Sequence, residues 1–379
     1  MATFFNLFNP FNLFNIKVIL IYRKRNPAFF SIEKVFDVVA KEASVSGTDA
    51  FEKVGLPFTS RGIFSIIFNL LYLSRFKKGL FHITGDVHYA ILALPKDRTI
   101  LTIHDLVFLH TYSGLRRALL KWIFLDLPVR KAKYITTISE KSKQEILDYT
   151  NCDPEKILVI PNPVDPIFAT STSSTPSTPS TVLTSLNLPQ PLSTSLNPST
   201  ISTPSTPSTP STPSTILFLG TKPNKNLELT IPALFGLDLH LRIIGELTRK
   251  QKEVLAKFKI NYTVVYSIST EQLVDEYRNA SVILFPSTYE GFGLPVIEGF
   301  QAERPVITSN ISPMKDVAGD AAILVDPYSI ASIREGVINL LSSHQRQKEL
   351  VEAGKEKVAN YQPGFIAGLY QDLWRKLES

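Results

Sequence analysis

The sequence predicts an α/β fold built from two doubly wound halves that face each other across a cleft. Three observations lead to this prediction: short Val- and Ile-rich runs alternate with helical patterns, a charge-free stretch at residues 169–215 interrupts the alternation, and the same alternation then resumes. Near-continuous apolar strands separated by helices are typical of parallel sheets buried on both faces. At 379 residues, the chain is long enough for two domains with separate cores.

The first half contains the elements of one such domain. Helices are predicted at residues 31–43, where Ser31 begins the helix, and at residues 141–149. The run GIFSIIFNLLYL at residues 62–73 is too short to span a bilayer and contains Asn69, so we expect a buried or interfacial helix there. Five β-rich runs predict strands at residues 17–22, 81–84, 99–104, 134–139 and 157–161.

The second half repeats the pattern after the interruption. The segments NLELTIPAL, TRKQKEVLAKF, EQLVDEYRNA and SIREGVINLLSS predict helices. In open α/β sheets ligands bind beyond the carboxyl ends of the strands, so the cleft between the halves is the expected site. Further strands are predicted at residues 215–220, 239–245, 262–267, 281–286 and 305–309.

Two segments are expected to lie outside the folded cores. Residues 169–215 consist largely of Ser-Thr-Pro triplets, which favour an extended linker because they cannot bury enough apolar surface to fold. We interpret the linker as an expanded repeat tolerated at a surface loop, although glycosylation or a partner would also fit it. Residues 1–15 repeat Phe and Asn and form a low-complexity tail.

The charge of the chain is concentrated in its first half. Residues 1–168 hold 22 Lys and Arg against 15 Asp and Glu, a net +7, whereas residues 216–379 hold 18 against 19, a net −1. The basic half suggests a polyanionic partner or an anionic membrane face, but a solvated surface with excess lysine explains it equally well. We expect no nucleic-acid partner. The single Cys152 excludes an internal disulfide, and the N-terminus lacks a basic segment before its apolar run, so a cytoplasmic location is expected.

The stretch FPSTYEGFGLPVIEGF at residues 285–300 carries the clearest chemical signal. The predicted strand before it ends at the edge of the sheet where ligands bind in open α/β folds. Two glycines then allow a sharp turn with exposed backbone amides. Pro295 suits the first turn of a helix, whose free amides favour an oxygen-rich or anionic ligand. Glu298 lies one turn into that helix, where its carboxylate can accept two hydrogen bonds from a vicinal diol.

The string YEGFGLPVIE resembles the E-x7-E signature of the retaining GT-B glycosyltransferases of family GT4. The flanking segments TILFLGTKPNKNLELTIPAL and PVITSNISPMKDVAGDAAILVDP are similar to those of the family, as are TILTIHDLVFL, ITTISEKSKQEI and KILVIPNPVD in the first half. The resemblance covers most of the chain from about residue 81, apart from the linker. It implies two Rossmann-like domains and a closing helix, arranged as a tail at 1–15, an acceptor domain at 16–168, the linker at 169–215, a nucleotide-sugar domain at 216–362 and a helix at 363–379 that crosses back.

The resemblance also implies roles for individual residues. Glu290 would face the donor sugar, and Glu298 would hold the ribose hydroxyls of the nucleotide. Lys225 would bind the diphosphate, where a fixed cation stabilises the charge that develops on the leaving group. Lys222 is the nearest candidate for the family's second basic residue. The backbone that binds the donor would be the turn formed by Gly291, Phe292, Gly293 and Leu294.

Other polar residues near the predicted cleft allow two readings each. His104 matches the donor-facing histidine of the family, and it is the third candidate catalytic residue beside Glu290 and Lys225. Asp105 would cap a helix or orient His104, and Ser139 would line the cleft or cap a helix. The basic run at residues 23–25 would contact ligand or lie on the rim of the cleft. The spacing of His82, Asp86 and His88 fits no standard zinc pattern, so we expect cleft-edge or structural roles.

Together these features predict a retaining hexosyltransferase that uses a GDP- or UDP-sugar as donor and requires no cofactor. With no Asp-x-Asp in the sequence, a metal-independent mechanism is expected. The acceptor would be a carbohydrate or a lipid-linked sugar in polysaccharide or glycolipid assembly, with peripheral contact to an anionic membrane. The alternatives are an impaired nucleotide-sugar-binding module or scaffold subunit, and an epimerase or hydrolase with the same fold.

Overall fold

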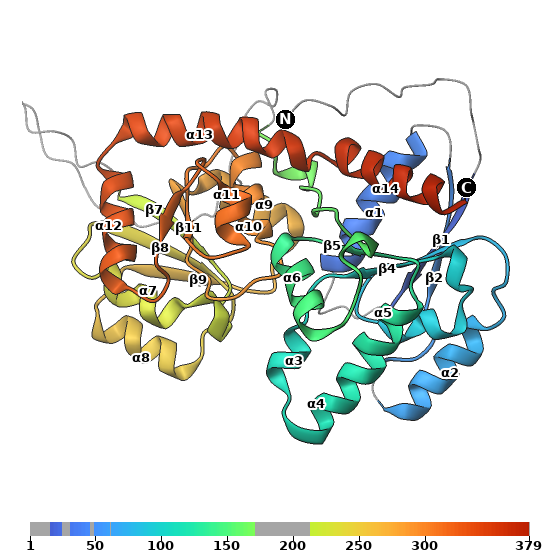
Figure 1. The fold of residues 1–379 in the computed structure, drawn as a ribbon. Coiled ribbons are helices and arrows are strands. Elements are labelled where there is room, and N and C mark those ends of the chain that lie inside the picture. The colour runs from blue at the N-terminus through green and yellow to red at the C-terminus, as the bar shows by residue number, and fades with distance from the viewer. Residues whose placement is uncertain (1–15, 25–30, 46–48, 61, 171–212, 379) are drawn as a thin grey trace, which may run out of the picture.

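The structure is a computed structural model that describes residues 16–24, 31–45, 49–60, 62–170 and 213–378. The predicted N-terminal tail and nearly all of the predicted linker lie outside these residues. The described chain forms two parallel sheets of six strands each, and Figure 1 shows them side by side in two lobes. The doubly wound α/β fold expected from the sequence is therefore confirmed.

The first sheet has the strand order β2-β1-β3-β4-β5-β6. The chain reverses its direction of travel across the sheet between β1 and β3, which are neighbours paired in parallel from Val18 to Ile21. Such a reversal opens a crevice at the carboxyl ends of the strands. The strands are β1 (Ile16–Tyr22), β2 (Asp49–Gly55), β3 (Leu80–Ile83), β4 (Thr99–Ile103), β5 (Tyr134–Thr137) and β6 (Ile157–Val159).

Helices cover both faces of this sheet (Figure 1). A π-helical segment, Trp122–Asp126, joins two of them into one long irregular rod. The edge strand β2 was not predicted, because three charged residues interrupt its sequence DAFEKVG and only Val54 among its middle residues is buried. The helices are α1 (Ser31–Val45), α2 (Ile63–Leu73), α3 (Val107–Thr111), α4 (Gly114–Lys121), α5 (Leu127–Lys131) and α6 (Glu140–Tyr149).

The second sheet has the strand order β12-β11-β10-β7-β8-β9. Its reversal lies between β7 and β10, so the loops that follow these two strands open into the same crevice. The strands are β7 (Ser214–Leu219), β8 (Leu239–Ile244), β9 (Tyr262–Val265), β10 (Val282–Phe285), β11 (Val306–Ser309) and β12 (Ile323–Val325).

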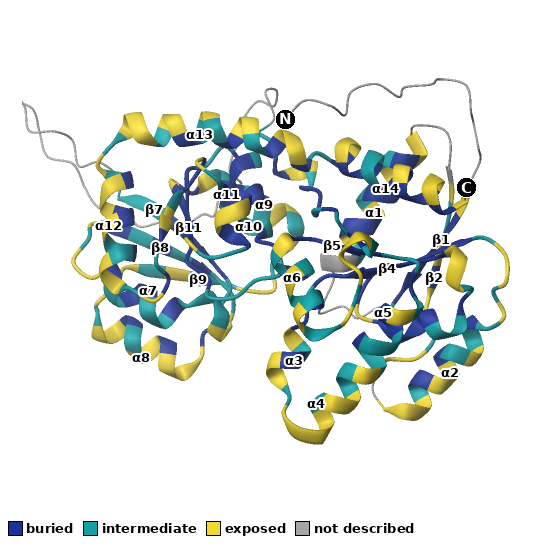
Figure 2. Ribbon diagram, in the orientation of Figure 1, coloured by how far each residue is buried: buried dark blue, intermediate teal, exposed yellow. Residues whose placement is uncertain are grey.

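The helices of the second domain cover this sheet in the same way, and the buried residues of both lobes concentrate along the strands (Figure 2). Glycines allow close packing here: a Cβ on Gly336 of α12 would come within 2.6 Å of Val325. The helices are α7 (Leu227–Ala233), α8 (Arg249–Lys257), α9 (Thr270–Asn279), α10 (Leu294–Gln301), α11 (Met314–Ala318), α12 (Ile330–Leu341) and α13 (His344–Val358).

The last helix, α14 (Pro363–Glu378), returns to the first domain and packs beside α1 (Figure 1). Its Trp374 is fully buried in the core formed by α1, β1 and β3. The indole Nε1 of Trp374 donates to His82 Nδ1 at 3.2 Å, and His82 Nε2 lies 2.7 Å from the Thr102 hydroxyl. These buried hydrogen bonds therefore attach the C-terminal helix α14 to β3 and β4.

Candidate functional site

The loop after β10 and the start of α10 form the centre of the site. Strand β10 is fully buried and ends at Phe285, which places the following loop at the carboxyl edge of the sheet. Gly293 precedes α10 with a φ of 111°, a conformation that a residue with a Cβ rarely adopts. Pro295 lies in the first turn of α10, and Glu298 follows one turn later.

Glu290 is held in place by three donors. Its Oε1 accepts hydrogen bonds from Lys225 Nζ and Ser287 Oγ, both at 2.6 Å, and from Asn224 Nδ2 at 3.1 Å. The side chains of Lys225 and Glu290 are only 19% and 16% exposed. Because the three donors converge on Oε1, they fix the direction of the carboxylate beside the cleft.

Lys225 reaches Glu290 from the loop after the neighbouring strand β7. Gly220 has a φ of 88°, and a Cβ on it would come within 2.9 Å of the Lys225 side chain. The glycine therefore leaves room for the lysine stem to fold back over the end of β7. Asn226, also in the left-handed region at φ 67°, then starts α7. The ammonium group lies 4.6 Å from the centre of the Phe285 ring, which adds a cation–π contact.

Glu298 is paired with Tyr277 of α9, whose hydroxyl donates to Oε2 at 2.6 Å. Burial raises the pKa of Glu298 to about 7, although the Tyr277 hydrogen bond acts in the opposite direction. A carboxyl group with this pKa exists in both protonation states near neutral pH. The hydrogen bond to Oε2 leaves Oε1 as the oxygen available to a diol.

The first domain contributes His104, at the carboxyl end of β4. The ring is buried, with 6% of the residue exposed, and its Nε2 lies 2.8 Å from the carbonyl oxygen of Thr84. A carbonyl only accepts, so Nε2 carries a proton and Nδ1 of the neutral ring is an acceptor. Asp105 accepts from the backbone amide of Val107, the first residue of α3, at 3.1 Å, and so satisfies one free amide at the start of that helix. Burial raises the pKa of Asp105.

The two domains touch directly at Gly291. The Ser139 hydroxyl donates to the carbonyl of Gly291 at 2.8 Å, and it also accepts from the amide of Ser142 at the start of α6. The helix-cap reading of Ser139 is therefore confirmed, and its hydroxyl also contacts the second domain, although Ser139 is not among the residues that line the cavity. Lys141 Nζ donates to the carbonyl of Glu290 at 3.2 Å. A Cβ on Gly291 would come within 3.2 Å of the carbonyl oxygen of His104, so a glycine permits the closest approach of the domains.

These residues surround one cavity of about 380 Å³ that both domains line. A cavity of this size suits a small polar ligand. The first domain contributes side chains around His104, and the second contributes the loop and helix described above. The lining residues are Val35, His104, Asp105, Ile138, Asn162, Lys225, Glu290, Gly291, Phe292, Gly293, Leu294, Pro295 and Glu298.

The structure brings together eight of the nine residues that the sequence singled out for the site. The ninth, Lys222, is exposed and does not line the cavity. The side chain of Phe292 packs in the core against Tyr361, so only its backbone is suited to ligand binding. Sequence reasoning missed Asn162 and Val35. For Asn162, the segment PNPVD directly after β6 offered a signal, since it follows a carboxyl strand end.

The remaining candidates have structural partners. The pKa of buried His82 is lowered to about 3 by desolvation, as expected for a neutral core residue. His88 Nδ1 lies 2.8 Å from the carbonyl oxygen of Phe124. Arg23 forms ion pairs of 2.7 Å with both Glu33 and Asp86. These contacts support structural roles for the histidines and a rim position for Arg23; Arg25 lies outside the described residues.

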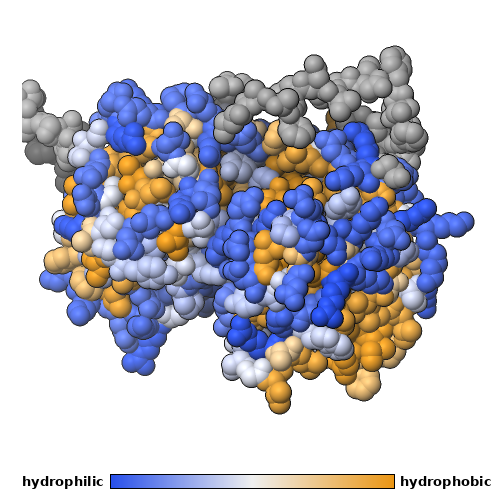
Figure 3. All heavy atoms as spheres, in the orientation of Figure 1, coloured by the Kyte–Doolittle hydropathy of each residue, from blue (hydrophilic) through white to orange (hydrophobic). Residues whose placement is uncertain are grey.

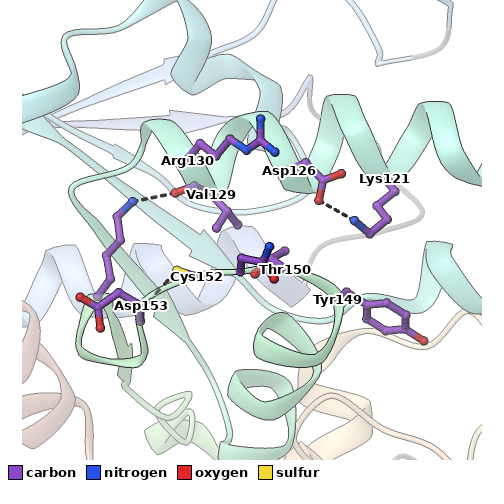
Figure 4. A pocket seen from close by; sticks show the side chains of 10 residues that line it. Lys121, Asp126, Val129, Arg130, Tyr149, Thr150, Cys152 and Asp153 are labelled. Carbon is purple, nitrogen blue, oxygen red and sulfur yellow. Dashed lines mark hydrogen bonds and ion pairs between the residues drawn. The ribbon is translucent and has the colours of Figure 1, made fainter.

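A second cavity, of about 420 Å³, lies within the first domain between α5 and the segment after α6 (Figure 4). Two of the cations that line it are committed to nearby acceptors: Lys121 pairs with Asp126 at 2.6 Å, and Lys156 donates to the carbonyl of Val129 at 2.7 Å. It contains none of the residues predicted for the site. We therefore place the functional site in the cavity shared by the domains.

Two features are absent from the part of the chain that the structure describes. No group of three or more His, Cys, Asp or Glu side chains is placed to hold a metal ion. Among the helices that the structure describes, none is both long and apolar enough to cross a membrane.

Comparison with known proteins identifies related sequences. The chain is 25% identical over 146 residues to an uncharacterized glycosyltransferase of Methanocaldococcus jannaschii, in a match that covers 37% of this chain and 42% of that protein. It is 23% identical over 337 residues to the O-antigen chain mannosyltransferase RfbU of Salmonella typhimurium, covering 82% and 84%. The chain thus spans less than half of the first relative and most of the second.

Solved structures share the fold. A glycosyltransferase from Rickettsia africae aligns with a TM-score of 0.69 at 16% identity, over 96% of this chain and 99% of that chain. HepE of Anabaena in complex with UDP and glucose aligns with a TM-score of 0.67 at 11% identity, over 96% and 100%. Residues 16–168 match the family described as Glycosyltransferase Family 4, and residues 204–357 match Glycosyl transferases group 1. With both domains matched and the two-sheet GT-B fold in place, the chain belongs to the group 1, family 4 glycosyltransferases.

Proposed function

We propose that the protein transfers a hexose, with retention of anomeric configuration, from a nucleotide sugar to an acceptor hydroxyl. The observation that carries this proposal is the cavity shared by both domains, in which Glu290, Glu298 and Lys225 meet His104. A donor held by the second domain and an acceptor approaching from the first would react in this cavity. Water is the competing acceptor, so closure of the two domains around the bound donor would favour transfer.

The second domain offers separate contacts for the ribose and for the diphosphate of the donor. The free Oε1 of Glu298 is suited to the ribose diol, and the N-terminus of α10 is suited to the diphosphate. Lys225 supplies a cation whose attraction grows as the sugar–phosphate bond breaks and negative charge collects on the leaving group. Its contact with Glu290 positions it before the donor arrives.

Glu290 and His104 would orient the sugar. The backbone of residues 291–293 turns around the sugar position, and the Glu290 carboxylate is suited to accept hydrogen bonds from hydroxyls. The Nδ1 atom of His104 is the remaining ring nitrogen, because Nε2 donates to Thr84. We propose that Nδ1 accepts a hydrogen bond from a sugar hydroxyl, which would fix the sugar relative to the acceptor.

The related proteins suggest which sugar is transferred and which kind of acceptor receives it. RfbU of Salmonella typhimurium and WbdA of Escherichia coli are mannosyltransferases, and CapM of Staphylococcus aureus serves capsular polysaccharide biosynthesis. We propose a mannose-type hexose as the donor sugar and a growing polysaccharide or a lipid-linked sugar as the acceptor. We propose guanine or uracil as the base of the donor nucleotide. HepE, which is seen with UDP and glucose, supports uracil.

The test is a turnover assay with the full chain. GDP-mannose and UDP-sugars are supplied with a panel of lipid-linked and free glycan acceptors, and release of nucleotide diphosphate is measured. Acceptor-dependent release that Glu290→Ala abolishes supports the proposal, and NMR of the product anomer tests retention. Tight donor binding without turnover on any acceptor would instead indicate a nucleotide-sugar-binding module, and release without an acceptor would indicate a hydrolase.

A further inference from the structure

Helix α2 exposes its apolar face to solvent. Its sequence IFSIIFNLLYL contains no charged residue. The exposed side chains recur with helical spacing and so form one continuous stripe along the helix. They are Ile63 at 54% exposed, Phe64 at 73%, Ile67 at 44%, Phe68 at 53% and Leu71 at 58%.

The polar residue of α2 faces inward and fixes this orientation. Asn69 is fully buried. Its amide nitrogen donates to the carbonyl of Phe58 at 3.0 Å and to the Tyr89 hydroxyl at 2.8 Å, and its oxygen accepts from the amide of Phe58 at 3.1 Å. Rotating the helix to bury the apolar stripe would leave these groups without partners, which costs about 1–3 kcal/mol each. The exposure of the stripe is therefore built into the fold.

Along the sequence, α2 lies in a stretch that contains cations and no acids. Residues 53–85, which contain α2, include five Lys and Arg and no Asp or Glu. Three of these cations, Arg75, Lys77 and Lys78, follow directly after the helix and are exposed. Figure 1 shows α2 at the outer edge of the first lobe, and Figure 3 shows hydrophobic residues gathered over that edge.

Helix α4 of the same domain also combines exposed apolar side chains with nearby cations. Helix α4 includes Arg116 and Arg117 and no acid, whereas Lys121 at its end pairs with Asp126 at 2.6 Å. Leu115 is 92% exposed, Leu119 55% and Trp122 51%. Tryptophan is enriched where proteins meet the interface of a bilayer. The excess positive charge of the first half is thus placed beside exposed apolar side chains.

We propose that the α2 stripe docks the protein onto the surface of an anionic lipid bilayer. An apolar helix face inserts at the boundary between headgroups and acyl chains, and the flanking cations attract anionic headgroups. A helix of 11 residues is about 16 Å long, too short to span a bilayer but suited to lie along its surface. The one-signed charge also disfavours a second copy of the same patch, because like charges would face each other.

Vesicle co-sedimentation of the full chain tests this proposal without reference to catalysis. We expect binding to phosphatidylcholine vesicles that contain phosphatidylglycerol, weak binding to phosphatidylcholine alone, and weakening between about 0.1 M and 1 M salt. The double substitution Phe64→Ser and Phe68→Ser should lower the partition coefficient at least about tenfold. Replacing Lys77 and Lys78 by Glu should abolish the preference for the anionic lipid.

The matched control is Phe235→Ser, since Phe235 is 52% exposed but lies in the second domain. It should bind vesicles as the unaltered protein does. Thermal unfolding verifies that each variant folds, and the α2 variants should keep their melting temperature because both phenylalanines are exposed. The proposal is overturned if the unaltered protein ignores anionic vesicles, if the α2 variant binds equally well, or if analytical ultracentrifugation shows that the stripe instead holds two copies together.

Discussion

Lys225 and Glu290 lie 65 residues apart in the chain and 2.6 Å apart in the structure. They follow β7 and β10, which are neighbours at the reversal point of the second sheet. The pair is largely shielded from water, so its two charges attract each other more strongly than a surface pair would. The cation proposed to stabilise the leaving group is thus positioned by the carboxylate proposed to face the sugar.

Removing the Lys225 ammonium should harm catalysis more than folding. We expect Lys225→Ala to lower turnover by about 10²–10³-fold because no cation would meet the developing diphosphate charge. The loss in the free energy of unfolding should be about 1–3 kcal/mol, since Glu290 keeps its contacts with Ser287 and Asn224. Steady-state kinetics and urea unfolding measure the two effects.

The matched control for that substitution is Lys222→Ala, three residues earlier. Lys222 is exposed and outside the cavity, so its removal should change turnover less than about threefold. Equal losses from the two substitutions would contradict the assignment of the phosphate contact to Lys225.

Donor affinity should depend on pH through Glu298. The pKa of this residue is about 7, and only its carboxylate form accepts both diol hydrogen bonds. The dissociation constant of an intact nucleotide sugar should therefore rise about tenfold for each pH unit below 7 and stay level above it. Calorimetric titration between about pH 5.5 and 8.5 measures this profile. Intact donors are required because a terminal phosphate titrates near pH 6.

Two variants assign that profile to Glu298. Glu298→Gln should bind donor weakly at every pH. Tyr277→Phe should move the midpoint upward, since the Tyr277 hydrogen bond stabilises the carboxylate. A profile unchanged in Tyr277→Phe would disprove the assignment.

The same raised pKa has a consequence for stability. Between the ordinary value of 4.5 and about 7, the folded state holds a proton on Glu298 that the unfolded state has released. The contribution of Glu298 to the free energy of unfolding should therefore fall as pH rises through this window. Subtracting the pH profile of Glu298→Gln from that of the unaltered protein, in urea unfolding, isolates this contribution.

Gly291→Ala should separate the domains slightly. The added Cβ would come within 3.2 Å of the His104 carbonyl oxygen and 3.4 Å of the Asp105 side chain, so one side must give way by a few tenths of an ångström. We expect turnover to fall by about tenfold or more while donor affinity changes little, because the donor contacts lie in the second domain. Gly368→Ala, with no atom within 4 Å of the added Cβ, serves as the control and should leave both quantities unchanged.

Trp374→Phe should weaken the attachment of α14 to the first domain. The change removes the donor to His82 Nδ1 and leaves a buried acceptor without its partner, at a cost of about 1–3 kcal/mol in the free energy of unfolding. Trp122→Phe is the matched control, since that residue is 51% exposed and should cost less than about 0.5 kcal/mol. Comparable losses in the free energy of unfolding from the two substitutions would refute a special role for the buried hydrogen bond of Trp374.

Local pattern was sufficient for much of the fold. Strands such as β4 and β10 are fully buried and read as continuous apolar runs, so their type and position could be predicted. The edge strand β2 could not, because only Val54 among its middle residues is buried and charged residues interrupt its apolar ones. Glu298 could be placed one turn into a helix because Gly293 and Pro295 mark where that helix begins.

The partners of the site residues could not be read from local pattern. Nothing near Glu298 in the sequence points to Tyr277, which reaches it from another helix. Asn162 lines the cavity because β6 ends at the edge of the sheet that faces the second domain. The family resemblance favoured Lys225 over Lys222 in the segment GTKPNKN, but its contact with Glu290 depends on the turn after Gly220 and on the packing of β7 beside β10.

The sequence by itself determined the alternation of strands and helices, the division into two halves and the loop-to-helix geometry around Glu290 and Glu298. These features depend on periodicity and turn chemistry within about ten residues. The tertiary structure alone decided that β7 lies beside β10 and that His104 meets Gly291. Such contacts arise from the packing of segments far apart in the chain, which local sequence preferences do not encode.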